Sequence, residues 1–142
     1  MDNKSGILYI VSTPIGNLND ITNRAIEILN KVDMCAAEDT RKSLKLFNAY
    51  NISTKLTSYH KFSENSKTAD LIKKLLCGKD IAIISDAGTP LISDPGRYLV
   101  NAAIGKGIKI VPIPGVTSVV TALSISGFNI DNFKYFGFLP RK

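Results

Sequence analysis

Short apolar runs alternate with longer amphipathic stretches along most of this chain. The runs lie at residues 7–11, 34–37, 56–59, 81–84 and 108–112, and the run from Ile81 to Ile84 contains no polar residue. Unbroken runs of this length are typical of strands buried on both faces of a parallel sheet. We therefore expect five strands here, of which 56–59 has the weakest pattern, and a sixth strand could begin within residues 133–139.

Between these runs, apolar residues recur at the spacing of a helix face. The expected helices begin at polar or turn-forming positions: Asp20 or Thr22, Thr40, Glu64 or Ser66, Asp94-Pro95, and the turn at 114–118 before a helix over 119–125. Thr40 and Asp94 are expected to cap their helices, because short polar side chains accept free backbone N–H groups there. The alternation predicts an α/β fold, a mostly parallel sheet with flanking helices, in one domain over residues 1–142.

The charge balance and the two cysteines narrow the class of protein. Eighteen basic and twelve acidic residues leave a formal charge of +6, which suits a polyanionic partner such as RNA, although lysines scattered over a solvated surface are the alternative. Cys35 and Cys77 share no metal-binding spacing, and we interpret both as reduced core thiols of a cytoplasmic protein. The first residues lack a secretory apolar segment, and no apolar run is long enough to cross a membrane.

Polar loops follow the expected strands, at the sheet edge where open α/β sheets bind ligands. The longest, residues 85–96 (SDAGTPLISDPG), connects a buried strand to a helix, and an ordinary connection is its alternative interpretation. The sequence contains no G-x-G-x-x-G, no nucleotide P-loop and no Cys/His cluster able to hold a metal. The only histidine is His60, which more often would be a surface or packing residue than a catalyst.

Five segments taken together resemble the tetrapyrrole methylase superfamily. They are residues 12–18 (STPIGNL), 37–41 (AEDTR), 85–96, 114–118 (PGVTS) and 137–142 (GFLPRK). Within the superfamily they resemble the branch that 2′-O-methylates a cytidine ribose of bacterial 16S ribosomal RNA. Relatives that modify tetrapyrroles carry a G-x-G-like sequence in the loop after the first strand and Gly-Asp-Pro in the loop after the fourth strand. This chain has Pro14-Ile15-Gly16 and Gly88-Thr89-Pro90 at those two places.

The resemblance implies two α/β domains with S-adenosylmethionine (SAM) bound in the cleft between them, and a homodimer. This chain is similar to the N-terminal domain only, so it would supply part of the cofactor pocket and be inactive alone. Matching positions imply cofactor contacts at nine residues: Ile15, Gly88, Thr89, Pro90, Ile92, Gly115, Thr117, Ser118 and Val119. For Ile15, Ile92 and Val119, core packing is the alternative.

The chemistry of ribose methylation adds further candidates. A 2′-hydroxyl needs a group that accepts its proton, and Glu38, Asp39 and Asp86 are carboxylates at expected strand ends, although Asp39 could instead pair with Arg41. Candidate contacts to RNA phosphates are Arg41, Lys42, Lys45 and Lys61, with a solvated helix face as the alternative. Tyr59 and Phe62 are the aromatic residues that could stack on a base.

Two other functions are compatible with these residues. The first is a tetrapyrrole C-methyltransferase acting on siroheme or cobalamin precursors. The second is a non-catalytic domain for RNA binding or dimerisation.

Overall fold

In the computed structural model, the described chain comprises residues 5–140. The predictions made for the first four residues, and for Arg141 and Lys142 in the 137–142 motif, lie outside this range. Five parallel strands form one sheet in the order β3-β2-β4-β1-β5. They are β1 (Leu8–Val11), β2 (Met34–Ala37), β3 (Leu56–Ser58), β4 (Ile81–Ile84) and β5 (Ile110–Ile113). The predicted α/β fold with a parallel sheet is confirmed.

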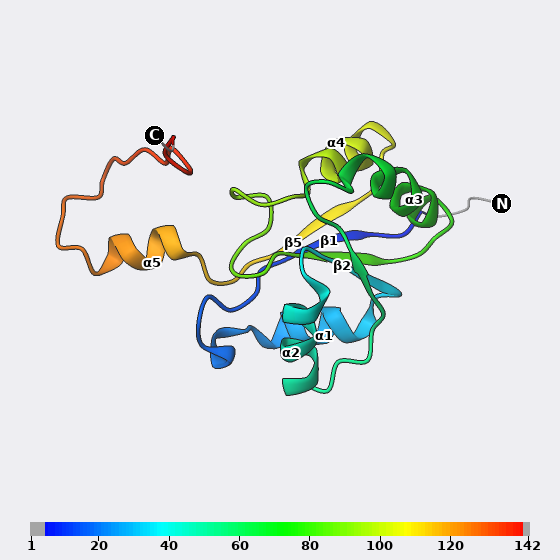
Figure 1. Cartoon of the computed structure of the whole chain (residues 1–142), viewed down its shortest axis with the longest axis horizontal. Helices are drawn as coiled ribbons and strands as arrows, with labels where there is room; N and C mark the ends of the chain where they lie inside the picture. The colour runs from blue at the N-terminus through cyan, green and yellow to red at the C-terminus, as the bar shows by residue number, and fades with distance from the viewer. Residues whose placement is uncertain (1–4, 141–142) are drawn as a thin grey trace.

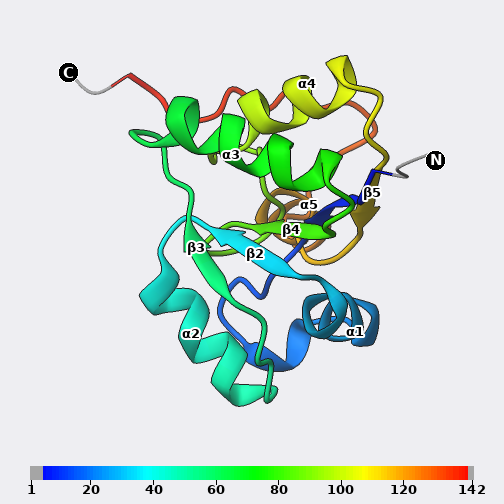
Figure 2. The same ribbon diagram turned by 90° about the vertical axis from the view of Figure 1, so that its right-hand side faces the viewer.

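The helices lie in two layers, one on each face of the sheet (Figures 1 and 2). A short 3-10 helix, η1 (Leu18–Asp20), precedes α1 (Asn23–Lys31), which covers one face together with α2 (Thr40–Ala49). The other face is covered by α3 (Glu64–Leu76) and α4 (Arg97–Gly105). The last helix, α5 (Ser118–Ser124), lies away from the sheet in Figure 1.

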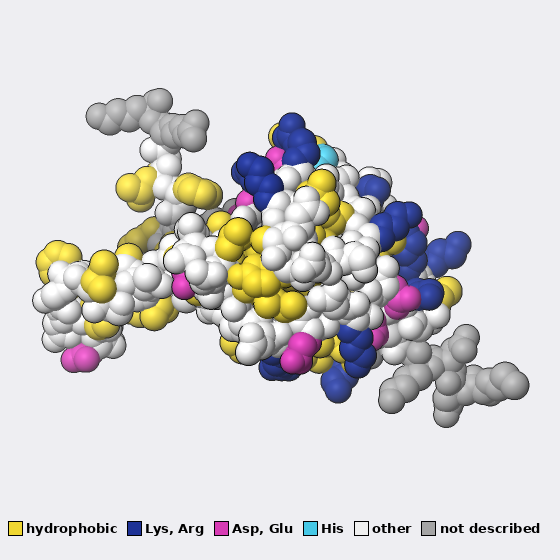
Figure 3. Space-filling model, turned by 90° about the horizontal axis from the view of Figure 1, so that it is seen from below, with side chains coloured by type: hydrophobic (Ala, Val, Ile, Leu, Met, Phe, Trp, Pro, Cys, Tyr) yellow, Lys and Arg dark blue, Asp and Glu magenta, His cyan; other side chains and the backbone are white. Residues whose placement is uncertain are grey.

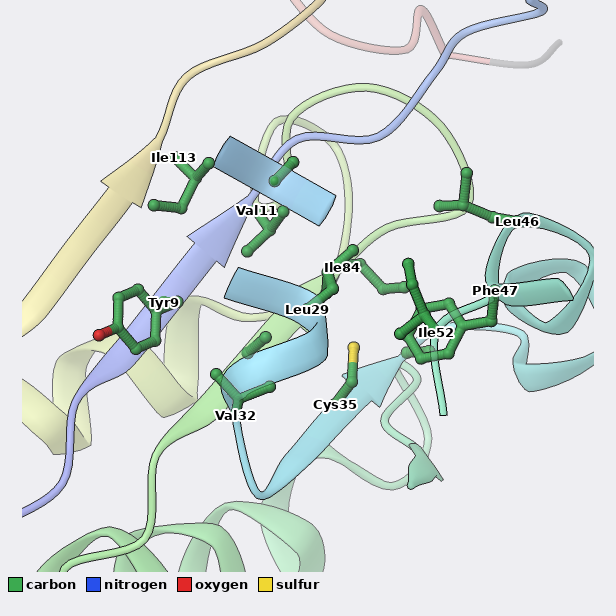
Figure 4. Packing of buried hydrophobic residues seen from close by; sticks show 13 residues of the cluster. Tyr9, Val11, Leu29, Val32, Cys35, Leu46, Phe47, Ile52, Ile84 and Ile113 are labelled. Carbon is green, nitrogen blue, oxygen red and sulfur yellow. The ribbon is translucent and has the colours of Figure 1, made fainter. Parts of the chain in front are cut away.

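The central strands alternate their side chains between two apolar cores. In β4, Ile81 and Ile83 pack with α3 and α4, whereas Ala82 and Ile84 pack with α1 and α2. Figure 4 shows the second of these cores, in which Phe47 and Leu29 approach the sheet from the helices. A strand buried on both faces carries no polar alternation, which is why β4 reads as an unbroken apolar run.

The helix caps differ from two of the predictions. Of the two expected candidates, Asp20 and Thr22, it is Thr22 that caps α1, since its Oγ1 accepts the N–H of Ala25 at 3.1 Å. Asp39, and not Thr40, caps α2 by accepting the N–H of Arg41 at 2.9 Å. The prediction that Asp94 caps the next helix is wrong: Gly96 occupies the cap position of α4 with φ +134°, which glycine tolerates better than other residues.

Three further expectations need correction. Residues 133–139 form no strand, because they lie in a segment that leaves the sheet and has no neighbour to accept ladder hydrogen bonds. The fifth strand begins at Ile110, not 108; Ile108 is buried against α3 and α4 instead. Cys35 is buried as predicted, but Cys77 is exposed because it follows the last turn of α3. None of the helices within residues 5–140 combines the length and apolar character that a membrane crossing requires.

Candidate functional site

Three loops from distant parts of the sequence are joined at the carboxyl edge of the sheet. Thr13 and Gly88 exchange two backbone hydrogen bonds of 2.9 Å. Next to them, the hydroxyls of Ser12 and Thr89 share a hydrogen bond of 3.0 Å, and Thr89 Oγ1 also donates to the Val116 carbonyl at 3.4 Å. The loops after β1, β4 and β5 therefore form one continuous surface, on the side from which the C-terminal segment projects (Figure 1).

Two glycines make this close approach possible. A Cβ on Gly115 would lie 2.7 Å from the Ser12 Cβ, closer than two carbons can approach. Gly88 has φ +78°, a left-handed conformation that favours glycine. In the same loop, Leu91 and Ser93 also adopt positive φ, at 74° and 66°, although neither is glycine. Strained backbone of this kind concentrates at functional sites.

The joined loops enclose a small hollow of about 60 Å³, here called the donor hollow. It is lined by Ala87, Gly88, Thr89, Ile92, Asp94, Thr117, Ser118, Val119 and Tyr135. Six of the nine predicted cofactor residues are in this lining. The other three lie behind it: Ile15 faces Gly88, Gly115 packs on Ser12, and Pro90 is fully buried.

Tyr135 is a lining residue that the sequence did not single out. Its hydroxyl shares a 2.8 Å hydrogen bond with the Ser93 hydroxyl, which brings the C-terminal segment back to the loop after β4. No spacing or motif relates these two positions, which are 42 residues apart. Asp94 was predicted only as a helix cap, and lies in the donor hollow instead.

Two of the three candidate carboxylates are already engaged. Asp39 forms two hydrogen bonds with the Arg41 guanidinium, at 2.9 and 3.1 Å, and this pairing lowers its pKa to about 2. Asp86 accepts the Asp39 N–H at 3.0 Å and the Lys42 ammonium at 2.6 Å. The alternative of a structural ion pair between Asp39 and Arg41 is therefore the arrangement observed. Asp86 links the loop after β4 to the start of α2.

Glu38 has different surroundings. It forms no ion pair within residues 5–140. Partial burial raises the pKa of Glu38, and the nearby charges of Asp86 and Asp94 raise it further. Burial, and then the charge of Asp86, also raises the pKa of Asp94. Perturbed carboxylates grouped in a cleft are typical of sites that transfer protons.

The four predicted phosphate contacts are divided among three hollows. Lys42 and Lys45 line one of about 180 Å³ beside Thr13 and Pro14. Lys61 lies in a larger one of about 400 Å³, the middle hollow, which contains Glu38, Asp94 and Arg97. Arg41, whose side chain is 90% exposed, lines the third, of about 410 Å³. Sequence reasoning missed Arg97, whose guanidinium lies 5.7 Å from the Tyr98 ring centroid.

Of the two candidate aromatics, only Phe62 is available for stacking. Tyr59 is 1% exposed and its hydroxyl bonds to Thr68 at 2.9 Å, so the prediction that it stacks on a base is wrong. Phe62 is 96% exposed. Sequence reasoning also missed Glu64, a buried carboxylate that accepts the Gly96 N–H at 2.7 Å and so fixes the end of the loop after β4.

Comparisons with known proteins identify relatives of this chain. The chain is 55% identical over 140 residues to the ribosomal RNA small subunit methyltransferase I of Vibrio cholerae, covering 99% of this chain and 49% of that protein. The protein of the same name from Pasteurella multocida is 54% identical over 142 residues, covering 100% and 50%. The chain thus spans about half the length of these curated relatives.

Among solved structures, uroporphyrin-III-C-methyltransferase from Thermus thermophilus superposes with a TM-score of 0.66 at 26% identity, over 89% of this chain and 55% of that one. A conserved hypothetical protein from Aeropyrum pernix K1, at 16% identity and a TM-score of 0.67, shares the fold. Residues 7–137 match the family of tetrapyrrole (corrin/porphyrin) methylases. Because that match extends over nearly the whole chain, this protein belongs to the tetrapyrrole methylase family.

Proposed function

We propose that this chain is the N-terminal domain of a SAM-dependent methyltransferase that modifies the 2′-hydroxyl of a cytidine in 16S ribosomal RNA. The junction of the loops after β1, β4 and β5 carries the proposal, because it gathers the predicted cofactor residues on one surface. The names of the relatives support the RNA substrate. Their identity of 54–55% is about twice the 26% to the uroporphyrin enzyme.

The residues of the donor hollow fit a ligand of this chemistry. SAM supplies an electrophilic methyl group on a cationic sulfur. Ile92 and Val119 offer apolar contact, Thr117 and Ser118 offer hydroxyls, and Gly88 lets the backbone approach closely. The hollow of about 60 Å³ is small, whereas pockets that enclose such ligands measure about 300–1,000 Å³. The chain therefore forms one wall, and a second domain would complete it.

Glu38 is the best candidate to accept the proton of the ribose hydroxyl. Asp39 and Asp86 are held by Arg41 and Lys42, so both act as positioning residues that fix the start of α2. The raised pKa of Glu38 brings its basicity closer to neutral pH, and a base of this kind contributes about 10²- to 10⁴-fold to a rate. Arg41, Lys42, Lys45 and Lys61, which are divided among three hollows, would bind phosphates of the RNA.

Methylation of small-subunit RNA by the full-length protein containing this chain tests the proposal. We expect incorporation of one methyl group at a ribose, detected by mass spectrometry of nuclease fragments. Glu38→Gln should lower kcat about 100-fold or more while calorimetric SAM affinity stays unchanged. Glu27→Gln, on the exposed face of α1, is the matched control. A Glu38→Gln enzyme with the wild-type rate would remove Glu38 from the mechanism, and a wild-type enzyme inactive on RNA would overturn the function.

The likeness to the uroporphyrin enzyme favours a second candidate, tetrapyrrole C-methylation. The same full-length protein, offered a uroporphyrinogen-type substrate with SAM, should give no methylated product if the RNA assignment is right. A protein that binds RNA and never transfers a methyl group would instead support the non-catalytic alternative. Homodimerisation and a cytoplasmic location, both expected for this family branch, stay predictions; analytical ultracentrifugation tests the first and cell fractionation the second.

A further inference from the structure

Three hollows follow one another along the carboxyl edge of the sheet. The donor hollow and the middle hollow share Asp94 as a lining residue. The middle hollow in turn shares Glu38 with the hollow of about 410 Å³ next to it. We call this last one the distal hollow. Glu38 thus lines two open hollows, and only one of them shares a lining residue with the donor hollow.

The distal hollow has the residues of a nucleotide site. Its wall is formed by Arg41, Ser58, His60 and Phe62 together with Thr40 and the carboxylates Glu38 and Asp39. Phe62 exposes nearly its whole ring, at 96%, and an aromatic ring of this kind is a platform for base stacking. Two of the five N–H groups of Arg41 donate to Asp39, and the other three remain able to donate to an anion. His60 Nδ1 is buried and has no hydrogen-bond partner in the described part of the chain.

The Phe62 ring is carried on a fixed turn. The Ser63 N–H donates to the His60 carbonyl at 2.8 Å, and the Ser63 hydroxyl bonds both the N–H and the carbonyl of His60 at 3.1 Å. Tyr59, buried directly before the turn, anchors it to α3 through Thr68. His60 meets the Phe62 ring edge-on, with centroids 6.3 Å apart. The turn that carries the ring is thus ordered before binding, so stacking of a base does not have to order this stretch of backbone.

We propose that the distal hollow binds the nucleotide next to the methylated one in the RNA chain, with its base stacked on Phe62 and its phosphate at Arg41. This inference rests on the proposed function, because it takes the ribose at Glu38 as the reacting one. The methylated nucleotide then occupies the middle hollow, beside the donor hollow, and its neighbour lies beyond Glu38. An aromatic ring stacks on any base. The site therefore determines which nucleotide of the RNA lies at Glu38 and does not distinguish between base types.

A Phe62→Ala variant of the full-length protein tests the proposal with a short single-stranded RNA that spans the target cytidine. We expect fluorescence anisotropy to show an affinity about 5- to 150-fold weaker. The salt dependence of binding should not change, because no charge is lost, whereas Arg41→Ala should flatten it. Phe62→Tyr keeps the ring and should restore binding. Ile104→Ala, which removes a 63% exposed apolar side chain from α4 outside all three hollows, is the matched control.

A 2-aminopurine placed on either side of the cytidine identifies the stacked position. With wild-type protein, one of the two positions should be quenched on binding, and Phe62→Ala should abolish that quenching. Unchanged affinity for Phe62→Ala, or quenching that persists without the ring, overturns the distal site and leaves the ring as a contact for another molecule. If the wild-type protein methylates the RNA in that case, the proposed function survives. A wild-type protein that neither binds nor methylates the RNA overturns both.

Discussion

The body of the molecule (residues 5–113) and its C-terminal arm (residues 114–140) have similar apolar content but use it in opposite ways. In the body, apolar side chains of the strands are covered by α1 and α2 on one face and by α3 and α4 on the other. In the arm, α5 buries no residue. Large apolar side chains lie exposed along the arm, at 77–87% for Ile125, Phe128, Phe136, Phe138 and Leu139. Figure 3 shows hydrophobic side chains, in yellow, at several places on the projecting part of the molecule.

The candidate site lies at the junction of the buried body and the exposed arm. A seven-residue helix without a core is too short to be stable by itself in water. In the described chain, two side-chain hydrogen bonds tie the arm to the body, Thr89 to Val116 and Ser93 to Tyr135, and both lie at the donor hollow. Contiguous exposed apolar surface is typical of an interface, so the arm is the part of the chain suited to pack on another domain or subunit.

Amide hydrogen exchange should give the largest contrast between the two regions. We expect amides of α5 and of residues 126–139 to exchange at least about 1,000-fold faster than those of β1 and β4, because opening the central strands requires global unfolding. Exchange measured by NMR or mass spectrometry on the 142-residue chain checks this. Equal protection in α5 and β4 would mean that the arm is packed in solution.

Removing an aromatic ring should have opposite consequences in body and arm. Phe47 is 1% exposed and Phe136 is 79% exposed. Phe47→Ala should lower the free energy of unfolding by about 3–5 kcal/mol, since it leaves a cavity between α2 and the sheet. Phe136→Ala should change it by less than about 0.5 kcal/mol. Urea unfolding followed by circular dichroism measures both, and a similar loss in the two variants would contradict the contrast.

A Gly115→Ala variant tests the junction between the arm and the body. Its Cβ would lie 2.7 Å from the Ser12 Cβ, so the loops after β1 and β5 must separate. We expect a loss of about 1–3 kcal/mol in unfolding free energy, with weaker SAM binding by the full-length protein. Gly105→Ala meets nothing within 4 Å at the end of α4 and should be neutral or stabilising. Calorimetric SAM titration showing wild-type affinity for Gly115→Ala would separate this loop from the cofactor.

The smallest expected effect concerns charge at the carboxyl edge of the body. Because the folded-state pKa of Glu38 is raised, its contribution to stability is present below the unfolded pKa and is lost as pH rises through the folded one. Glu38→Gln should therefore stabilise the chain slightly at pH 7, by no more than about 0.5 kcal/mol, and the gain should vanish in acid. Thermal unfolding from pH 4 to 8 checks the trend, with Glu27→Gln as control. A stability gain that grows toward low pH would contradict a raised pKa of Glu38 in the folded state.

Much of the body could be predicted from local pattern. The run from Ile81 to Ile84 identifies a strand buried on both faces, and the polar residues Asp20 and Thr22 limit the start of α1 to two positions, of which Thr22 is the one observed. The predicted strand at 133–139 failed because the apolar pattern records only that side chains should be covered, and not what covers them. The prediction that Cys77 is buried was wrong for a related reason, since Cys77 lies at the end of α3 and is exposed.

The α/β class, the helix and strand periods and the loops at which a site could form are visible in the amino-acid sequence, because they depend on residues close together in the chain. Which carboxylates form ion pairs depends on contacts between distant segments. Asp86 meets Lys42 across 44 positions and Tyr135 meets Ser93 across 42. Such pairings depend on how the strands are ordered in space, and it is the packing of separate segments that leaves Glu38 without an ion pair in the described chain and places Phe62 in the open.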